Sequence, residues 1–478
     1  MKKHIKIAAI ATGMVTALSM GACGGSGDKA AKISEKGTPE SYVKVAIRGQ
    51  DEDTMPIGTF LGPMDGYYGT GYKLDSLINE KSFIQMKDCY VNYIMDPRNT
   101  LSGQYGETLL DLADEYGISY FLSVPEVLDL SGADSSSAFV ATSETIVEKL
   151  RSAVENHACF AGVYGRDEPT TLLYEAIGRA IGELKTARTE LGAENLTAYY
   201  NLFPPVGGNQ LSYNTESGLT YEQYLQGFLD TDPDYLMFDN YPFLEGTDAI
   251  SGSWLNLLGT ISSAAAKNGV PWWGYVQCGG HFPDVSMAHR VVNEYEMNWN
   301  VNTMLCFGAK GIGYFPGFFP PEWGQQYPEF KEENTNDNSL INKYGSKTQS
   351  WYYAEKINKQ IAAADHVLMN SAHKGVIFTG EGPEGCKYTG NTVKTMSSFR
   401  VLKGVSGDDS LIACLDYKGG TALYVMNNSI TEHRGEVTLQ FDDYYEYEVI
   451  QRGVSDSLKA ESFTLTLEAG EAALVVVK

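Results

Sequence analysis

Between about residue 55 and residue 370, short apolar runs alternate with longer segments whose apolar residues recur every three to four positions. The short runs have the length of buried strands, and the longer segments have the period of amphipathic helices. This alternation predicts β/α units with a parallel sheet covered by helices. Eight units are present, so we expect the sheet to close into a barrel. The expected strands are 57–61, 89–95, 119–124, 162–164, 196–202, 235–238, 272–276 and part of 304–314.

The longer segments carry helix signals at their ends. Leu109, Ala113 and Tyr116 share one face, and Gly117 follows at the position where a left-handed residue commonly ends a helix. A last apolar face over 351–368 predicts the helix that completes this domain.

After residue 372 the pattern changes to short strands of alternating polarity, separated by Gly, Asp and Asn turns. This pattern is typical of an all-β sandwich. We therefore predict an α/β chain with a (β/α)8 TIM barrel over 46–370, followed by a β-sandwich over 371–478. The expected strands of the second domain are 376–379, 395–401, 410–415, 421–426, 435–441, 447–451, 462–467 and 472–477.

The amino terminus has the pattern of an export signal. Three lysines precede an apolar run that is too short and too alanine-rich for a stable membrane span, which predicts a signal peptide over 1–22. The sequence Met-Gly-Ala-Cys at 20–23 resembles the lipobox of bacterial lipoproteins, with Met20 where Leu is usual. The resemblance implies lipidation of Cys23 and anchoring to the extracellular face of the membrane, with 23–45 as a flexible linker. An ordinary cleaved signal with an incidental cysteine is the alternative.

Composition narrows the class of ligand. The formal net charge of −24 excludes a nucleic-acid-binding role, which needs a basic face, and it favours a neutral glycan over an acidic one. Solubility alone also explains such a charge. The 31 tyrosines and 6 tryptophans suit the stacking of sugar rings, although a large core uses aromatic residues too. The cysteines and histidines lack ligand spacing, so we expect no metal and no cofactor.

One polar cluster follows an expected strand directly. The apolar run 160–164 leads into Arg166-Asp167-Glu168-Pro169. In a parallel barrel the carboxyl ends of the strands form one face, the mouth, where catalytic residues gather. Glu168 is therefore our candidate general acid, with a pKa raised by apolar surroundings and by Asp167. The alternative is that both carboxylates only cap a helix that begins at Pro169.

Three segments resemble the barrel glycoside hydrolases of clan A, in which the acid/base glutamate ends the fourth strand, commonly as Asn-Glu-Pro. Here Asp167 stands where Asn is usual. The sequence CFGAKGIGYF at 306–315 is similar to the eighth strand of β-galactosidase-like barrels, and LEAGEAALVV at 467–476 is similar to the last strands of their β-domain. The resemblance implies hydrolysis of O-glycosidic bonds, with Glu168 as acid/base.

The second carboxyl group departs from that family. Clan A places its nucleophilic glutamate at the end of strand seven, where this chain has Gln277. The best replacement is Asp239, which ends the sixth strand. Strands four and six are next-nearest neighbours, on the order of 9 Å apart, a spacing typical of inverting enzymes. Three alternatives stay open: side-chain reach shortens the gap and the enzyme retains the anomer, Asp239 only binds sugar hydroxyls, or the barrel is a non-catalytic surface protein that binds glycan.

Other polar and aromatic residues lie in expected strands or directly after them, and we predict that they contact an oligo- or polysaccharide at the mouth. These candidate substrate contacts are Asp65, Asn92, Tyr93, Asp167, Tyr200, Asn201, Tyr241, Gln277, His281, Phe315, Phe318, Phe319 and Trp323.

Overall fold

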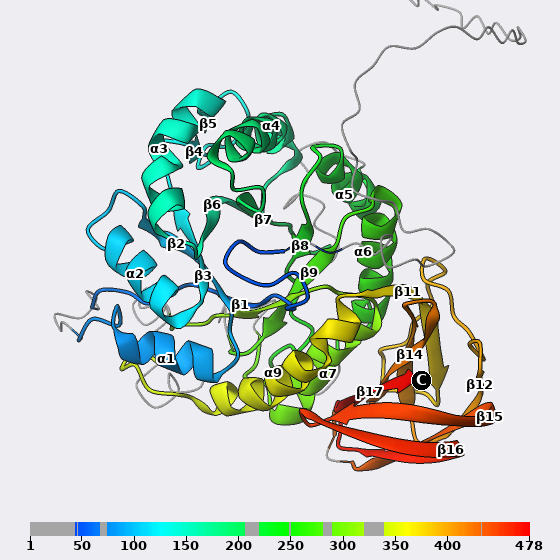
Figure 1. The fold of residues 1–478 in the computed structure, drawn as a ribbon. Helices are drawn as coiled ribbons and strands as arrows, with labels where there is room; N and C mark the ends of the chain where they lie inside the picture. The colour runs from blue at the N-terminus through cyan, green and yellow to red at the C-terminus, as the bar shows by residue number, and fades with distance from the viewer. Residues whose placement is uncertain are drawn as a thin grey trace, which may run out of the picture.

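The computed structural model describes residues 44, 46–66, 74–205, 219–247, 250–280, 289–319, 339–431 and 433–478. The chain forms an eight-stranded parallel sheet surrounded by helices, followed by an antiparallel β-domain (Figure 1). The predicted signal peptide and Cys23 lie outside the described residues, as does the linker apart from Lys44. Among the described helices, none combines the length and the apolar character that crossing a membrane requires.

The parallel sheet runs in chain order around a ring. Neighbouring strands pair from β7 through β6, β3, β2, β1, β10 and β9 to β8. A parallel bridge between Leu202 and Phe238 joins β7 to β8 and closes the ring. The predicted (β/α)8 barrel is therefore confirmed. Its strands are β1 (Ile57–Phe60), β2 (Tyr93–Thr100), β3 (Ser119–Ser123), β6 (Phe160–Asp167), β7 (Thr197–Asn201), β8 (Leu236–Phe238), β9 (Trp272–Gln277) and β10 (Ile312–Phe315).

Helices cover the outside of the barrel, and local sequence sets their ends. Gly117, Gly192 and Gly269 end three of them in the left-handed conformation. Thr220 and Asn293 begin two others with complete capping boxes. The helices are α1 (Glu80–Asp88), α2 (Gly106–Tyr116), α3 (Ser143–Asn156), α4 (Tyr174–Leu191), α5 (Tyr221–Leu229), α6 (Trp254–Asn268), α7 (Glu294–Cys306) and α9 (Gln349–Leu368).

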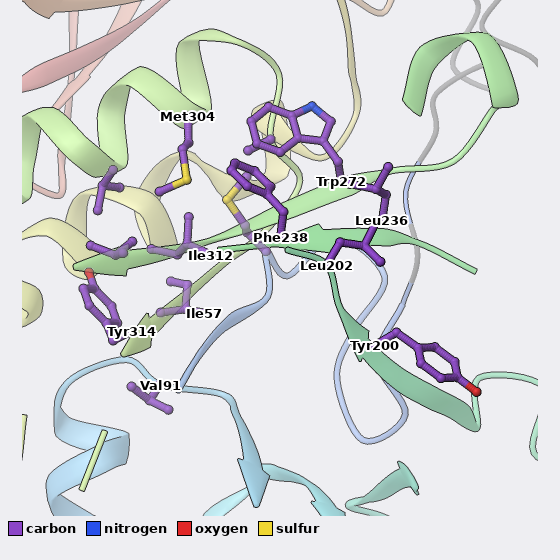
Figure 2. Close-up of a cluster of buried hydrophobic side chains, with 14 of the residues drawn as sticks. Ile57, Val91, Tyr200, Leu202, Leu236, Phe238, Trp272, Met304, Ile312 and Tyr314 are labelled. Atoms are coloured by element: carbon purple, nitrogen blue, oxygen red, sulfur yellow. The ribbon is translucent and has the colours of Figure 1, made fainter. Parts of the chain in front are cut away.

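Strand side chains alternate between two buried layers. Tyr199 belongs to the cluster inside the barrel, together with Tyr93, Met237 and Trp273. Tyr200, the next residue, belongs to the cluster between the strands and the helices. Figure 2 shows this outer cluster, in which Phe238 and Trp272 lie close together. The alternation decides which residues reach the mouth from the inside of the barrel.

The carboxy-terminal strands form an antiparallel β-domain around a separate core, which confirms the predicted second domain. The predicted strands 435–441 and 447–451 are one continuous strand, and 395–401 is not a strand apart from isolated bridges. In the barrel, the part of 304–314 that forms a strand is its end, since β10 begins at Ile312 and residues 304–306 belong to α7. The domain consists of β11 (Ser371–Thr379), β12 (Leu402–Gly407), β13 (Ser410–Tyr417), β14 (Gly420–Asn427), β15 (Gly435–Gln451), β16 (Val454–Leu467) and β17 (Ala472–Val477).

Buried hydrogen bonds join the β-domain to the barrel through α7. The Trp299 indole donates to Asn428 Oδ1 at 2.8 Å. The Asn302 amide donates to the Gly470 carbonyl at 2.7 Å and accepts from the Tyr424 hydroxyl at 2.8 Å. Because breaking such bonds leaves polar groups unpaired, the two parts are expected to move as one.

Candidate active site

Three adjacent strands bring carboxyl groups together at the mouth. β6 ends at Asp167, in register with Asn201 at the end of β7. The Asn201 amide donates to Asp167 Oδ1 at 2.9 Å, and the Glu168 backbone N–H donates to the Asn201 carbonyl at 2.8 Å. Asp239 follows β8, and its pKa responds to the charges of Glu168 and Asp167. Glu168, Asp167 and Asp239 therefore form one electrostatically coupled group of acids.

The backbone at Glu168 is strained. Its φ of 49° lies in the left-handed region, which is unfavourable for a residue with a β-carbon, and Pro169 follows it. Strain of this kind persists where the surrounding structure fixes a functional geometry. The next helical turn begins at Thr171 with Thr170 as its N-cap, and α4 begins only at Tyr174. The expectation that a helix begins at Pro169 was therefore wrong, and Glu168 caps none.

Burial and like charge keep Glu168 protonated at neutral pH. Loss of solvent is the larger cause and the charge of Asp167 the second, and together they raise the pKa of Glu168 from 4.5 to about 8. The Arg166 guanidinium opposes this shift. A glutamic acid that still holds its proton at pH 7 can donate it to a substrate oxygen.

Asp239 is the second acid of the group. Burial raises its pKa well above the usual value, and the charges of Glu168 and Asp167 add to the increase. The Asn201 side chain opposes it by hydrogen bonding. Asp239 Oδ1 is buried and has no hydrogen-bond partner among the residues that the structure describes. Since buried polar atoms are normally paired, this oxygen suits a water or a sugar hydroxyl.

Aromatic rings line the mouth beside the acids. The half-buried rings of Tyr241 and Phe315 stack with their centroids 5.5 Å apart, and His289 contacts the Tyr241 ring edge to face at 5.5 Å. Burial and the nearby Asp239 raise the pKa of Tyr241. The hydroxyls of Tyr199 and Tyr275 are hydrogen bonded to each other beneath this layer. The arrangement gives an apolar wall with acids at its edge, which is typical of small-molecule sites.

Two predicted substrate contacts lie elsewhere. Asn92 precedes β2 at the end opposite the mouth, where its side chain accepts from the Ile57 N–H and donates to the Met55 carbonyl, both at 2.9 Å. Tyr200 points out of the barrel and packs against Phe228 at 5.9 Å. Both predictions were wrong, because the register of a strand decides at which end and on which face of the barrel a residue lies, and the sequence does not show that register. A third predicted contact, Tyr93, is buried inside the barrel.

Gln277 is a structural residue. Its amide oxygen accepts from the Phe243 N–H at 3.0 Å, and its amide nitrogen donates to the carbonyls of Phe243 at 2.9 Å and of Arg290 at 2.8 Å. The side chain is fully buried. The predicted sugar contact is therefore corrected: Gln277 fixes the chain segments that follow β8 and precede α7.

The remaining predicted contacts divide into three groups. Asp65 lies in the loop after β1 and accepts from the Tyr105 hydroxyl of the loop after β2. Phe318 and Phe319, after β10, are almost fully buried. His281 and Trp323 lie outside the described residues.

The sequence interpretation missed residues that support the acids. The Tyr164 hydroxyl accepts from the Asp167 N–H at 3.0 Å. Burial raises the pKa of both Asp167 and Glu168, and the charge of the adjacent Arg166 opposes that rise. Both residues belong to the segment that leads into Glu168, so their closeness to Glu168 in the sequence could have identified them as site residues.

Solved structures with similar folds include glycoside hydrolases with TIM barrels. A family 42 β-galactosidase from G. stearothermophilus, solved as a catalytic mutant, has a TM-score of 0.52 at 8% identity, with 91% of this chain and 99% of that chain covered. A family 39 enzyme from Bacteroides cellulosilyticus has a TM-score of 0.48 at 9% identity, with 90% of this chain and 82% of that chain covered. A family 5 enzyme from Bacteroides vulgatus has a TM-score of 0.45 at 10% identity, with 93% of this chain and 92% of that chain covered. No family model and no curated protein matches the sequence. At such identities the first likeness concerns the fold alone.

Proposed function

We propose that this chain is a glycoside hydrolase that cleaves an O-glycosidic bond of a neutral glycan. The observation that carries the proposal is the convergence of Glu168 and Asp239 at the mouth, beside the Tyr241 and Phe315 rings. Glycoside cleavage needs two carboxyl groups with different protonation states, one to donate a proton and one to accept or attack.

The surroundings of each acid suggest its role. Burial and neighbouring charge raise the pKa of both Glu168 and Asp239, so the pair shares a proton at neutral pH, and in this proposal Glu168 carries it. Asn201 opposes the rise that burial causes in the pKa of Asp167 and of Asp239, because a donated hydrogen bond stabilises the ionised carboxylate. As the acids titrate together, a proton on Glu168 relieves the repulsion on Asp239. Glu168 then protonates the glycosidic oxygen as the bond to the anomeric carbon breaks.

Asp239 serves as the base in this proposal. It takes a proton from a water whose oxygen forms the new bond to the anomeric carbon. The aglycone leaves with the proton that Glu168 donated to the glycosidic oxygen. β7 lies between β6 and β8, so the two acids come from next-nearest strands, on the order of 9 Å apart at the backbone. Carboxyl groups that keep about this spacing leave room for a water and invert the anomer, whereas groups that side-chain reach brings to about 5–5.5 Å retain it. A proton NMR spectrum of the first product formed distinguishes the two anomers.

Charge and aromatic rings suggest the substrate class. Several acids close together repel a carboxylated sugar, whereas a neutral sugar can stack on an aromatic ring and hydrogen bond with carboxylates. The lipobox-like sequence at Cys23 supports a place on the extracellular face of the bacterial membrane.

A surface protein that binds glycan without cleaving it is the second candidate. The observation in its favour is Gln277, which occupies the strand end where clan A enzymes carry the nucleophile and which is committed to backbone groups. In that case the acids would only hold sugar hydroxyls.

The test compares the wild type with Glu168→Gln and Asp239→Asn on a panel of neutral oligosaccharides and of aryl glycosides whose phenols are weakly acidic. The exposed Glu194→Gln is the control. Turnover by the wild type and the control, with a loss of about 10²-fold or more in both site variants, supports the hydrolase. Calorimetric binding of an oligosaccharide without turnover by any protein refutes it and supports the binding protein.

A further inference from the structure

A second cluster of titratable side chains lies between α2 and the end of α3. Both helices belong to the layer outside the barrel (Figure 1). Glu107, Asp111 and Asp114 are spaced four and three residues apart, so they share one face of α2. His157, the C-cap residue of α3, faces them. Glu107 and Asp111 are exposed, whereas only 4% of the His157 surface is accessible.

Hydrogen bonds fix the orientation of the His157 ring. Its Nδ1 lies 2.9 Å from Asp114 Oδ2, and Asp114 Oδ1 accepts from the Cys159 N–H at 2.8 Å. The Arg48 guanidinium donates to the His157 carbonyl at 2.6 Å. With Nδ1–H donating to the carboxylate, the lone pair of Nε2 is available on the other side of the ring.

The free side of the ring points at carboxylates. His157 Nε2 is buried, without a hydrogen-bond partner in the described part of the chain, and lies 3.4 Å from Glu107 Oε1. The ligand atoms of Glu107, Asp111 and His157 all lie within 4.8 Å of one another. A buried nitrogen without a hydrogen-bond partner is unfavourable, and a cation between it and the neighbouring carboxylates would satisfy it.

We propose that Glu107, Asp111 and His157 bind a divalent transition-metal ion of the zinc type. One imidazole and two carboxylates are ligands that Zn²⁺ accepts, and the exposed side leaves the fourth position to water. Tetrahedral bonds of about 2.0–2.1 Å place neighbouring ligand atoms about 3.3 Å apart, close to the 3.4 Å between His157 Nε2 and Glu107. Asp114 supplies the carboxylate–histidine contact that orients a metal-bound ring. Calcium and magnesium prefer oxygen ligands alone.

The ion would act on stability. It ties α2 to the end of α3, and Asp114 also holds Cys159, the residue before β6. β6 carries Asp167 at its mouth end. The ion, which lies outside the barrel, would therefore support the strand that positions the acids. This inference is independent of the proposed function.

Metal titration of the full chain, freed of metal with a chelator, tests the site. We expect one Zn²⁺ to bind per chain, and Co²⁺ to give visible absorption typical of tetrahedral nitrogen and oxygen coordination. The double variant Glu107→Gln/Asp111→Asn should weaken Zn²⁺ at least about tenfold and abolish the rise in Tm that zinc produces. Asp114→Asn should weaken binding by about 10–100-fold with both carboxylate ligands in place.

The matched control is Glu144→Gln/Glu148→Gln, an exposed pair four residues apart on α3. It should bind Zn²⁺ as the wild type does. Equal binding by the wild type and the Glu107→Gln/Asp111→Asn variant, or no binding to the wild type at micromolar to 100 μM zinc, overturns the proposal. Because both replaced ligands are exposed, circular dichroism should show a folded variant.

Discussion

Replacing the proposed general acid should stabilise the protein while it removes activity. Glu168→Gln keeps the size of the side chain and replaces a buried, repelled carboxyl by a neutral amide. The folded chain holds the Glu168 proton up to a pH of about 8, whereas an unfolded glutamate loses it near 4.5. Between these values the wild type must take up a proton to fold, so its stability falls as pH rises.

The magnitude follows from this linkage. Each pH unit in the window from 4.5 to about 8 lowers the free energy of unfolding by about 1.4 kcal/mol. At pH 7 the full effect is about 3 kcal/mol, and partial exposure of the side chain reduces it to about 2 kcal/mol. Below pH 4.5 both states are protonated and the penalty vanishes. Glu168→Gln should therefore unfold at higher urea than the wild type at pH 7.5, and at nearly the same urea at pH 4.5.

The assay is urea unfolding followed by tryptophan fluorescence at several pH values, with Glu194→Gln as the exposed control. The gain in unfolding free energy of Glu168→Gln over the wild type should grow with pH, and the control should show none. A gain that is independent of pH, or a loss at pH 7.5, would refute the argument that burial and Asp167 hold the proton on Glu168.

Three further predictions concern Asp167, Gln277 and Cys23. Asp167→Asn removes a like charge, so the pKa of Glu168 falls and the alkaline limit of kcat/KM moves from about 8 to lower pH; an unchanged limit contradicts the coupling. Gln277→Leu removes the partner of the Phe243 N–H and of the Arg290 carbonyl and should lower the free energy of unfolding in urea by about 2–4 kcal/mol; a raised KM at unchanged stability would mean that Gln277 contacts the sugar. Cys23→Ala should move the protein from the membrane fraction to the medium of expressing bacteria; continued membrane association argues against the lipid anchor.

The barrel was predictable because its signal is repeated. Each β/α unit shows the strand and helix periods, and Gly117 marks a helix end in the sequence as in the structure. Strand boundaries were less predictable, since an apolar run does not show where pairing begins. Asn92 was assigned to the mouth because β2 was expected to end near residue 95, but it begins at Tyr93 and runs to Thr100.

Faces and partners depended on contacts across the chain. Tyr199 and Tyr200 are chemically identical, and only pairing with neighbouring strands puts one inside and the other outside. Gln277 lies at a strand end as expected, but its use was decided by the backbone at Phe243 and Arg290. Glu107 and His157 lie on different helices, so their sequence spacing carries no ligand pattern.

The dependence of hydrolysis on the leaving group tests the central claim most directly. An aryl glycoside with a strongly acidic phenol needs no protonation as its bond breaks, whereas one with a weakly acidic phenol does. If Glu168 supplies that proton, Glu168→Gln should retain most of the wild-type kcat/KM on the first substrate and lose at least about a hundredfold on the second. Equal losses on both substrates, or none on either, would contradict Glu168 as the general acid.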